Sequence, residues 1–506
     1  MADSLQLDGR SLTLEMVEQV ALGAVHDISL APSARARVVE SRTFVESLVH
    51  QGRVIYGVST GFGRMAEVLI PADQREALQR NLIRSHATGV GEPLSREAVR
   101  AILLLRANAL AKGNSGCRPE VIDGLLGMLN AGIHPRIPCM GSVGASGDLA
   151  PLAHAALALI GEGEVEFGGH VVPASEALAA ADLTPLDLRE KEGLALINGT
   201  QATTGLGILT LLRAERALET ADLAGACSLE GLRGTPEAFR PEVQEVRPHP
   251  GQAASAERLR AYMAGSEIRE SHRTNDARVQ DAYCLRCMPQ VHGAARECLS
   301  HVRRILDVEA NSATDNPLIF PAADAVVSAG NFHAQVVAQA LDFLCIAVAD
   351  VAAISERRLE RLLNPDLSGL PAFMAAEPGL DSGFMIAQVA VVDILAEMRV
   401  LAHPASVDSV PTSANQEDHV SMGMAASRKA ARAVELLEYV LGAELLAGAQ
   451  AVEYHRPLRA GSAVEATLAL IRARVPRLEH DRPLSSDLEA MKTLVSSGAI
   501  MKELQQ

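Results

Sequence analysis

The segment Val336–Arg358, "VVAQALDFLCIAVADVAAISERR", constrains the fold of this chain more than any other stretch. It contains neither glycine nor proline and is apolar on most of a helical circumference, which predicts a helix buried inside a bundle. Met424–Ala447 and Ala463–Val475 have the same pattern with more charges. Aromatic residues make up only 3% and tryptophan is absent, so alanine, leucine and valine must fill the core. We therefore expect a mainly α protein with a long central helical bundle.

The loops and the long helices are distributed unevenly along the chain. Glycine-rich and polar loops, with short strand-like pieces at 53–63 and 164–172, fall mostly before Thr200. After it helical patterns dominate, interrupted at 232–252 and 363–384. The sequence predicts a loop-rich N-terminal part over residues 1–200 and a long-helix part over 201–506, with one continuous domain as the alternative.

Composition limits the partners that this chain can have. Its 46 basic and 62 acidic residues give a formal charge of −16, which disfavours nucleic acid and an anionic membrane surface as partners. The apolar region Val336–Ile354 is interrupted by Gln339, Asp342 and Asp350, so we do not expect it to span lipid. The first residues lack a basic stretch followed by an apolar one, and the seven cysteines are an odd number. We expect a cytoplasmic location.

The stretch Met140–His154, "MGSVGASGDLAPLAH", places three glycines and two serines within residues 141–147. A phosphate-binding loop is one interpretation, but the stretch matches neither known glycine-rich phosphate motif and no lysine follows it. A tight turn is another, with Asp148 capping a helix that begins near Leu149 and has Pro151 in its first turn.

The third interpretation is chemical. In Ala145-Ser146-Gly147 the glycine nitrogen can approach the alanine carbonyl closely, because glycine tolerates the bent backbone that this approach requires. Ring closure and loss of water, including the serine hydroxyl, would leave a methylidene group conjugated to an imidazolone. The chain would thereby make a strong electrophile from itself.

The stretch "GSVGASGDLAPLAH" resembles the signature of the aromatic amino acid ammonia-lyases and aminomutases, in which Ala-Ser-Gly matures into this methylidene-imidazolone (MIO). Further segments match the family in order: "YGVSTGFG" at 56–63, "EGLALINGTQ" at 192–201, "QDAYCLRCMPQVHG" at 280–293, "NSATDNPLIF" at 311–320, "GNFHAQ" at 330–335, "ISERR" at 354–358, "SGFMIAQVA" at 382–390 and "SANQEDHVSMG" at 413–423. The resemblance implies a helical homotetramer with active sites shared between subunits, an amino acid substrate, MIO formed from Ala145, Ser146 and Gly147, and no external cofactor.

Two positions bear on the substrate. Leu78, Leu82 and His86 lie at helical spacing with Ser85 beside them, so His86 is either a hydrogen-bonded core residue or part of a pocket. In the family this dipeptide lines the substrate pocket, and Ser85-His86 resembles the histidine-specific branch. Glu417 fits that branch too, because a carboxylate suits an imidazole better than a phenyl ring.

Glu417 also has a purely local interpretation, since Ser413 and Gln416 have the spacing of a capping box at a helix start. The resemblance nevertheless favours elimination of ammonia from L-histidine to give trans-urocanate. An aminomutase, or a lyase for another aromatic or modified histidine substrate, remains the alternative.

The resemblance also suggests roles for individual residues. Catalytic roles fall to Ser146, Tyr56, Tyr283 and Glu417. Tyr56 is the expected base, which requires a depressed phenol pKa; Tyr283 and Glu417 stay open as alternatives, as does whether the amine or the ring attacks the electrophile. Substrate-binding roles fall to His86, Asn198, Gln280, Arg286, Asn316 and Phe332.

Two of these binding residues also have plain alternatives. Arg286 is expected to hold the substrate carboxylate as a bidentate fork, the alternative being an ordinary salt bridge. Asn198 is expected near the electrophile, the alternative being an Asn-Gly turn.

Cys284 and Cys287 have the spacing of half a zinc site, but no second Cys or His pair matches them, so we expect no catalytic metal. The chain departs from the family pattern at Ser59, Ala329 and Gln335, where Asn, Gly and Glu are common. Gln335 removes a charge near the expected pocket, which leaves a variant substrate open.

Overall fold

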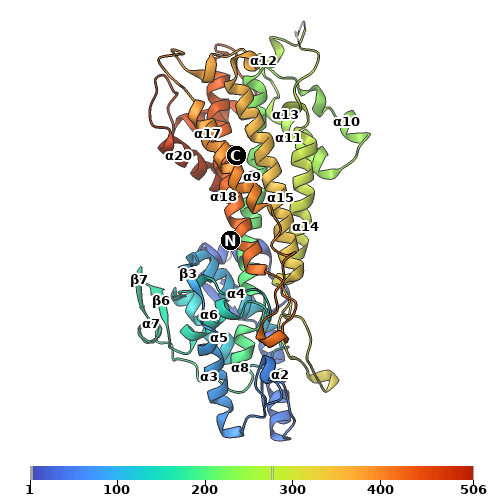
Figure 1. Cartoon of the computed structure of the whole chain (residues 1–506), viewed down its shortest axis with the longest axis vertical. Helices are drawn as coiled ribbons and strands as arrows, with labels where there is room; N and C mark the ends of the chain where they lie inside the picture. Colours follow the sequence, from blue (N-terminus) through green and yellow to red (C-terminus); the bar gives the residue numbers. More distant parts are fainter. Residues whose placement is uncertain (1–3, 275, 277, 505–506) are drawn as a thin grey trace. The chain divides into compact units, whose positions relative to one another are not determined.

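The computed structural model describes residues 4–274, 276 and 278–504. Within them the chain forms twenty-one α-helices, six 3-10 helices and nine short strands (Figure 1). The longest helices are α9 (Gln201–Gly231), α14 (Met288–Ala310), α15 (Gln335–Leu363) and α18 (Gly423–Glu453). The mainly α class predicted from the apolar periodicity is confirmed.

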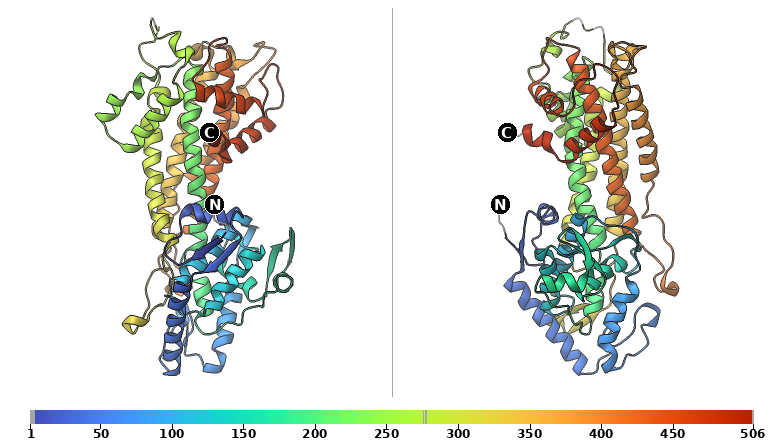
Figure 2. Two further views of the ribbon diagram at one scale, coloured as in Figure 1. Left: turned by 180° about the vertical axis from the view of Figure 1, so that it is seen from behind. Right: turned by 90° about the vertical axis from the view of Figure 1, so that its left-hand side faces the viewer.

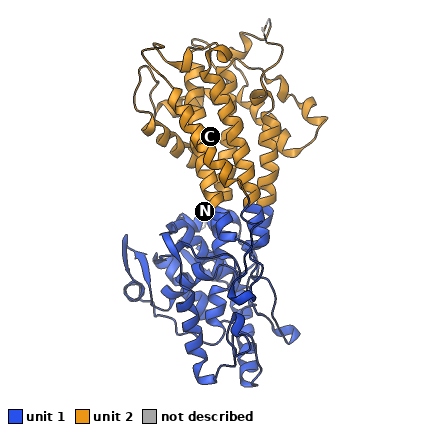
Figure 3. Cartoon of the chain, in the orientation of Figure 1, with its two compact units in different colours: residues 1–209, 303–341, 404–428 blue, residues 210–302, 342–403, 429–506 orange. Residues whose placement is uncertain are grey.

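The chain divides into two compact units (Figure 3). Unit 1 contains Met1–Leu209, Arg303–Leu341 and Pro404–Arg428; unit 2 contains Thr210–Val302, Asp342–His403 and Lys429–Gln506. Unit 1 thus joins the loop-rich N-terminal region to two segments from much later in the sequence. A boundary at one sequence position cannot describe unit 1, because its three segments are separated along the chain.

Unit 1 is built from short helices around a buried one. Its helices are α1 (Leu14–Ala21), α2 (Pro32–His50), α3 (Arg75–His86), α4 (Arg96–Ala111), α5 (Pro119–Ala131), α6 (Leu149–Leu159), α7 (Ala174–Ala180) and α8 (Glu192–Ile197). Helix α4 is buried along almost its whole length and packs against α1 and α5. Ser95 caps it, its hydroxyl accepting a hydrogen bond from the Ala98 amide at 3.3 Å.

The strands of unit 1 form small local sheets. They are β1 (Ser4–Leu7) parallel to β2 (Asp27–Leu30), β3 (Val90–Pro93) antiparallel to β5 (Pro138–Met140), the order β4 (His134–Pro135)–β6 (Glu164–Phe167)–β7 (His170–Pro173), and β8 (Leu318–Phe320) antiparallel to β9 (Ala325–Val327). The strand-like piece at 164–172 is confirmed as the β6–β7 hairpin.

The strand-like interpretation of 53–63 is wrong. Those residues form successive turns followed by the start of a short 3-10 helix, η1 (Gly63–Met65), with one isolated bridge from Thr60 to Leu69. The Ser59 hydroxyl accepts from the Ile55 amide at 2.9 Å, and Gly57 has φ +68°. A local side-chain bond and a left-handed glycine therefore outweigh the strand propensity of the valine and isoleucine residues.

Unit 2 holds the remaining helices. They are α10 (Pro241–Glu245), α11 (Pro250–Tyr262), α12 (Glu267–Glu270), α13 (Tyr283–Arg286), α16 (Pro365–Ser368), α17 (Met385–Leu401), α19 (Ser462–Arg472), α20 (Ser485–Ser496) and α21 (Ala499–Leu504). Within this unit, parts of the four longest helices run side by side (Figure 2). Arg358 and Glu444 form a fully buried ion pair there. The Ser228 and Ser355 hydroxyls both donate hydrogen bonds to the Glu444 carboxylate.

Among the described residues, α15 alone has the length and hydropathy needed to cross a membrane. However, 61% of its most apolar window is buried inside the protein. The core helix of a globular protein meets the same criteria, so this helix is accounted for by the bundle that the sequence predicts.

Candidate active site

The tripeptide loop, residues 141–147, lies between strand β5 and helix α6 of unit 1. Gly147 has φ +74°, and a Cβ placed on it would overlap the Gly199 carbonyl. An isolated bridge also joins Gly147 to Gly199. The backbone is thus bent at the glycine, and only glycine fits there. This is the geometry that the chemical interpretation of Ala145-Ser146-Gly147 requires.

Asp148 does not cap α6 through its side chain, contrary to the tight-turn interpretation. Its carboxylate accepts instead from the Thr203 amide at 2.7 Å and the Thr203 hydroxyl at 2.8 Å. Its own amide donates to the Gly199 carbonyl at 2.7 Å. Burial raises the pKa of Asp148 to about 6, and the bonds from Thr203 oppose that rise. Asp148 therefore fastens the tripeptide loop to the start of α9.

A cavity of about 370 Å³ in unit 1 opens beside this loop. Five of the predicted site residues line it together: Tyr56, His86, Ser146, Asn198 and Glu417. The other lining residues are Phe62, Gly63, Met65, Leu78, Asn81, Leu82, Ser85, Leu149, Leu194 and Ser413. Most of these ten are apolar or small, so they enclose the polar groups.

Ser146 is held from two directions within the cavity. Its hydroxyl donates to Oε1 of Glu417 at 2.8 Å, and its carbonyl accepts from Nδ2 of Asn198 at 3.0 Å. A backbone bond from the Met422 amide to the Val143 carbonyl, 2.9 Å long, fixes the segment that carries Glu417 against the tripeptide loop.

Asn198 carries an unused acceptor. Its Oδ1 atom is buried and has no hydrogen-bond partner within the described structure. Unsatisfied buried polar atoms are rare in folded proteins. Asn198 therefore offers an acceptor to whatever fills the cavity, while its Nδ2 holds the tripeptide.

Tyr56 does not have the depressed pKa that a base would require. Burial of the phenol raises its pKa above the ordinary value of 10.0, the hydrogen bond from the Gly63 amide lowers it, and the charge of Glu417 raises it again. The Gly63 amide donates to the phenol oxygen at 3.1 Å. The ring of Phe62 packs edge-on against the phenol, with 6.3 Å between centroids.

His86 lies in the last turn of α3, and Leu78, Leu82 and His86 share the face that lines the cavity, as their spacing predicts. Nδ1 of His86 is 2.8 Å from the Leu82 carbonyl. A carbonyl can only accept, so Nδ1 carries a hydrogen, and in the neutral ring Nε2 is the acceptor.

The remaining predicted residues do not line this cavity. Gln280, Tyr283 and Arg286 belong to unit 2. Tyr283 is 72% exposed, and the Arg286 guanidinium lies over its ring at 4.6 Å. The buried Nε of Arg286 has no hydrogen-bond partner within the described residues.

Asn316 and Phe332 belong to unit 1 but lie outside the cavity wall. Asn316 accepts from the Ala329 amide at 2.8 Å and so shapes the loop before Phe332. Gln335, one of the departures from the family pattern, donates to the Ser406 carbonyl at 3.1 Å.

Some lining residues were not predicted. Asn81 could have been found, because it lies four positions before Ser85 on the same helix. Gly63 closes the quoted motif "YGVSTGFG", yet no local pattern indicates that its amide faces Tyr56. Nothing in the sequence singles out Ser413 as a wall residue.

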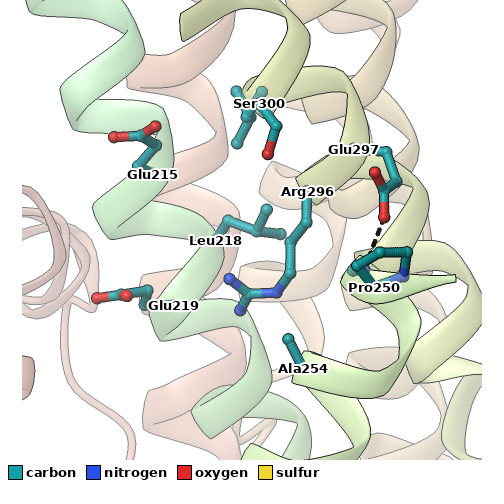
Figure 4. Close-up of a pocket in the computed structure, with 10 residues that line it drawn as sticks. Glu215, Leu218, Glu219, Pro250, Ala254, Arg296, Glu297 and Ser300 are labelled. Atoms are coloured by element: carbon teal, nitrogen blue, oxygen red, sulfur yellow. Dashed lines mark hydrogen bonds between the residues drawn. The ribbon is translucent and has the colours of Figure 1, made fainter.

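A second cavity, of about 390 Å³, lies in unit 2 between α9, α11 and α14 (Figure 4). None of the predicted site residues lines it. Its charged groups already have partners: Glu297 accepts from the Gly251 amide at 2.7 Å, Glu219 pairs with Arg258 at 2.9 Å, and Arg296 pairs with Asp222. It offers no reactive group and is not the candidate site.

No group of three or more metal-binding side chains occurs in the described part of the chain, and Cys284 and Cys287 are free thiols. The expectation of catalysis without a metal stays a prediction.

Comparison with known proteins bears on this geometry. The family model described as aromatic amino acid lyase matches residues 12–473. A histidine ammonia-lyase of Anaeromyxobacter sp. (strain K) is 54% identical over 98% of this chain and 99% of its own, and one of Gloeobacter violaceus is 51% identical over 100% and 98%.

Solved structures agree with these relatives. Histidine ammonia-lyase from Trypanosoma cruzi has a TM-score of 0.92 at 43% identity, covering 99% of this chain and 95% of that one. Tyrosine aminomutase from Streptomyces globisporus has a TM-score of 0.94 at 39% identity, covering 99% and 98%. Together with the bent Ala-Ser-Gly loop, these matches show that the chain belongs to the aromatic amino acid lyase family.

Proposed function

We propose that this protein eliminates ammonia from L-histidine to give trans-urocanate. The observation that carries the proposal is the cavity that brings together Ser146, Glu417 and His86. The names of the relatives, histidine ammonia-lyases in several bacteria, point to the same reaction.

The tripeptide Ala145-Ser146-Gly147 fits the maturation to MIO that we propose. Gly147 is bent as ring closure requires, and Asn198 donates to the Ser146 carbonyl, which would become the carbonyl of the imidazolone. When formed, MIO supplies an electrophile that turns the substrate amine into a better leaving group. No external cofactor is then needed.

Specificity for histidine follows from the Glu417 carboxylate, a hydrogen-bond acceptor in the cavity wall. The single N–H of a neutral imidazole ring can donate to this carboxylate. A phenyl ring has no donor and would leave the carboxylate unpaired, at about 1–3 kcal/mol.

We assign removal of the β-proton to Tyr56, whose phenol lies in the cavity wall. The phenol must lose its own proton first, and the Gly63 amide is the contact that stabilises its anion. Burial and the charge of Glu417 oppose ionisation, so the reaction is expected to need alkaline conditions. Tyr283 and Glu417 remain the alternatives.

We also propose that the protein is a homotetramer whose active sites are shared between subunits. Arg286, Tyr283 and Gln280 lie outside the unit 1 cavity, although a substrate carboxylate needs a cation such as Arg286. Helix α17 carries exposed apolar side chains, among them Ile386 at 65% and Val389 at 57%, which a second subunit would cover. The acidic balance disfavours nucleic acid and an anionic membrane surface as partners, and the seven free cysteines suit a cytoplasmic location.

The decisive experiment incubates the purified protein separately with L-histidine, L-tyrosine and L-phenylalanine, measuring ammonia and the absorbance of a conjugated product. We expect ammonia and urocanate from L-histidine alone. A β-amino acid without free ammonia would instead establish an aminomutase, the alternative that the similarity to tyrosine aminomutase raises. An intact mass lower by two water molecules would report the matured tripeptide.

A further inference from the structure

Thr412 holds the far side of the Glu417 carboxylate. Its hydroxyl donates to Oε2 of Glu417 at 2.9 Å. Two backbone bonds join the same pair, from the Thr412 amide to the Glu417 carbonyl at 2.8 Å and from the Glu417 amide to the Thr412 carbonyl at 3.3 Å. Main chain and side chain together therefore fix the orientation of Glu417 relative to Thr412.

The turn between the two residues is strained. Ser413, Ala414 and Asn415 have φ of 50°, 52° and 65°, and none of them is glycine. A left-handed conformation is unfavourable for an ordinary residue, and it persists only where the surroundings enforce it. Strain of this kind is concentrated at functional sites.

Neighbouring groups enforce this turn from the cavity side. Gly63 lies so close to Ser413 that a Cβ on Gly63 would be 2.6 Å from the Ser413 hydroxyl. Gly63 is also the residue whose amide donates to Tyr56. The turn 412–417 and the loop carrying Tyr56 are thus packed against each other within unit 1.

The two carboxylate oxygens of Glu417 have different hydrogen-bond donors. Oε1 accepts from the Ser146 hydroxyl, the group that the tripeptide loses as water if it matures as proposed, whereas Oε2 accepts from Thr412, which maturation leaves untouched. Maturation would free Oε1 toward the cavity while Oε2 remained fastened.

We propose that Thr412 is a positioning residue for histidine: it locks Glu417 so that Oε1 faces the substrate imidazole. The inference rests on the proposed function. A carboxylate held through one oxygen loses less rotational freedom when the other oxygen binds a ligand, and the ligand gains affinity.

Substrate binding can be separated from turnover in the background Ser146→Ala, which cannot form MIO and leaves Oε1 without the serine donor. In that protein we expect Thr412→Val to weaken L-histidine binding, measured by calorimetry, by about tenfold, equivalent to about 1.4 kcal/mol. Thr412→Ser, which keeps the hydroxyl, should stay within about threefold of the background, less than 0.7 kcal/mol.

Ser409→Ala is the matched control. The Ser409 hydroxyl accepts from the Val420 amide at 3.0 Å, so it stabilises the same segment, but its bond goes to the backbone and not to Glu417. Its loss should leave L-histidine binding unchanged. Equal weakening by Ser409→Ala and Thr412→Val would overturn the proposal, because the effect would then be one of loop stability.

A double-mutant cycle supplies a second test that does not depend on the fold tolerating valine. With Ser146 intact, Thr412→Ala should lower kcat/KM for L-histidine in the wild type but add nothing in Glu417→Ala, which has no side-chain acceptor for the Thr412 hydroxyl. Additive effects would overturn the proposal. The unmutated protein separates the two hypotheses: no ammonia from L-histidine defeats the proposed function itself, whereas ammonia release with additive effects defeats only the role of Thr412.

Discussion

The Ser146 hydroxyl donates to Oε1 of Glu417 at 2.8 Å, although 271 positions separate the two residues in the sequence. The contact joins the central residue of the tripeptide to the carboxylate expected to face the substrate ring. It lies inside unit 1, which takes Glu417 from its third chain segment.

Replacing Ser146 by alanine removes the hydroxyl whose loss generates the methylidene group. We expect Ser146→Ala to keep its full mass, without the deficit of two waters, and to lose activity on L-histidine by at least about a thousandfold, or about 4 kcal/mol. Intact-mass spectrometry and an ammonia assay measure both. Turnover in a chain of full mass would show that the tripeptide is not the electrophile.

Replacing Gly63 by alanine tests the packing between Tyr56 and the strained turn. Gly63 has φ +54°, and an added Cβ would collide with the Ser413 hydroxyl. The displaced amide would stabilise the Tyr56 phenolate less well, so we expect kcat/KM to fall by about tenfold or more, about 1.4 kcal/mol.

The matched control for this variant is Gly52→Ala. Gly52 has φ +70°, but a Cβ there meets no atom within 4 Å. It imposes similar backbone strain outside the cavity and should leave kcat/KM unchanged. If both variants lost the same activity, strain alone would explain the loss and the Gly63–Tyr56 contact would have no special role.

Replacing Glu417 by glutamine tests whether Tyr56 is the base. The charge of Glu417 raises the pKa of Tyr56, so a neutral side chain should lower that pKa. If Tyr56 acts as its anion, the rise of kcat/KM with pH should move to lower pH in Glu417→Gln, while the maximum falls because imidazole binding is weaker. An unmoved profile would favour Tyr283, which lies in unit 2.

Local sequence patterns were sufficient to predict the helices and one wall of the cavity. The apolar run in α15 and the spacing of Leu78, Leu82 and His86 both follow from the helical period, and the structure has both. The sequence signal is strong there because residues close together along the chain determine whether a helix forms and which side chains share a face.

Other features depend on contacts that no local pattern records. Asp148 has the position of a helix cap, yet Thr203 of α9 takes its carboxylate. The sequence of the loop carrying Tyr56 predicts a strand, yet the Ser59 hydroxyl accepts a hydrogen bond from the Ile55 amide and stabilises a turn there. The pairing of Glu417 with Ser146 and Thr412 arises only when distant segments assemble into unit 1.

The raised pKa of Asp148 predicts how stability depends on pH. The folded value is about 6, against an ordinary value of 3.8, so folding disfavours the charged form. The stabilisation that protonated Asp148 gives the folded protein is therefore fully present below pH ~4 and is lost as the pH rises through about 6. The free energy of unfolding falls by about 3 kcal/mol over this range, because the pKa is shifted by about two units. Asp148→Asn is neutral throughout, and its amide can still pair with Thr203. Relative to the wild type, this variant should gain thermal stability between pH 4 and pH 7.

The control for that comparison is Asp187→Asn, since the side chain of Asp187 is 87% exposed. Its stability relative to the wild type across the same pH range measures the effect of losing one exposed carboxylate, which the change in Asp148→Asn must exceed. A difference between Asp148→Asn and the wild type that is the same at pH 4 and pH 7 would mean that Asp148 stays charged in the folded protein. Thr203 would then compensate its burial fully, and the carboxylate would act as a permanent anion behind the tripeptide loop.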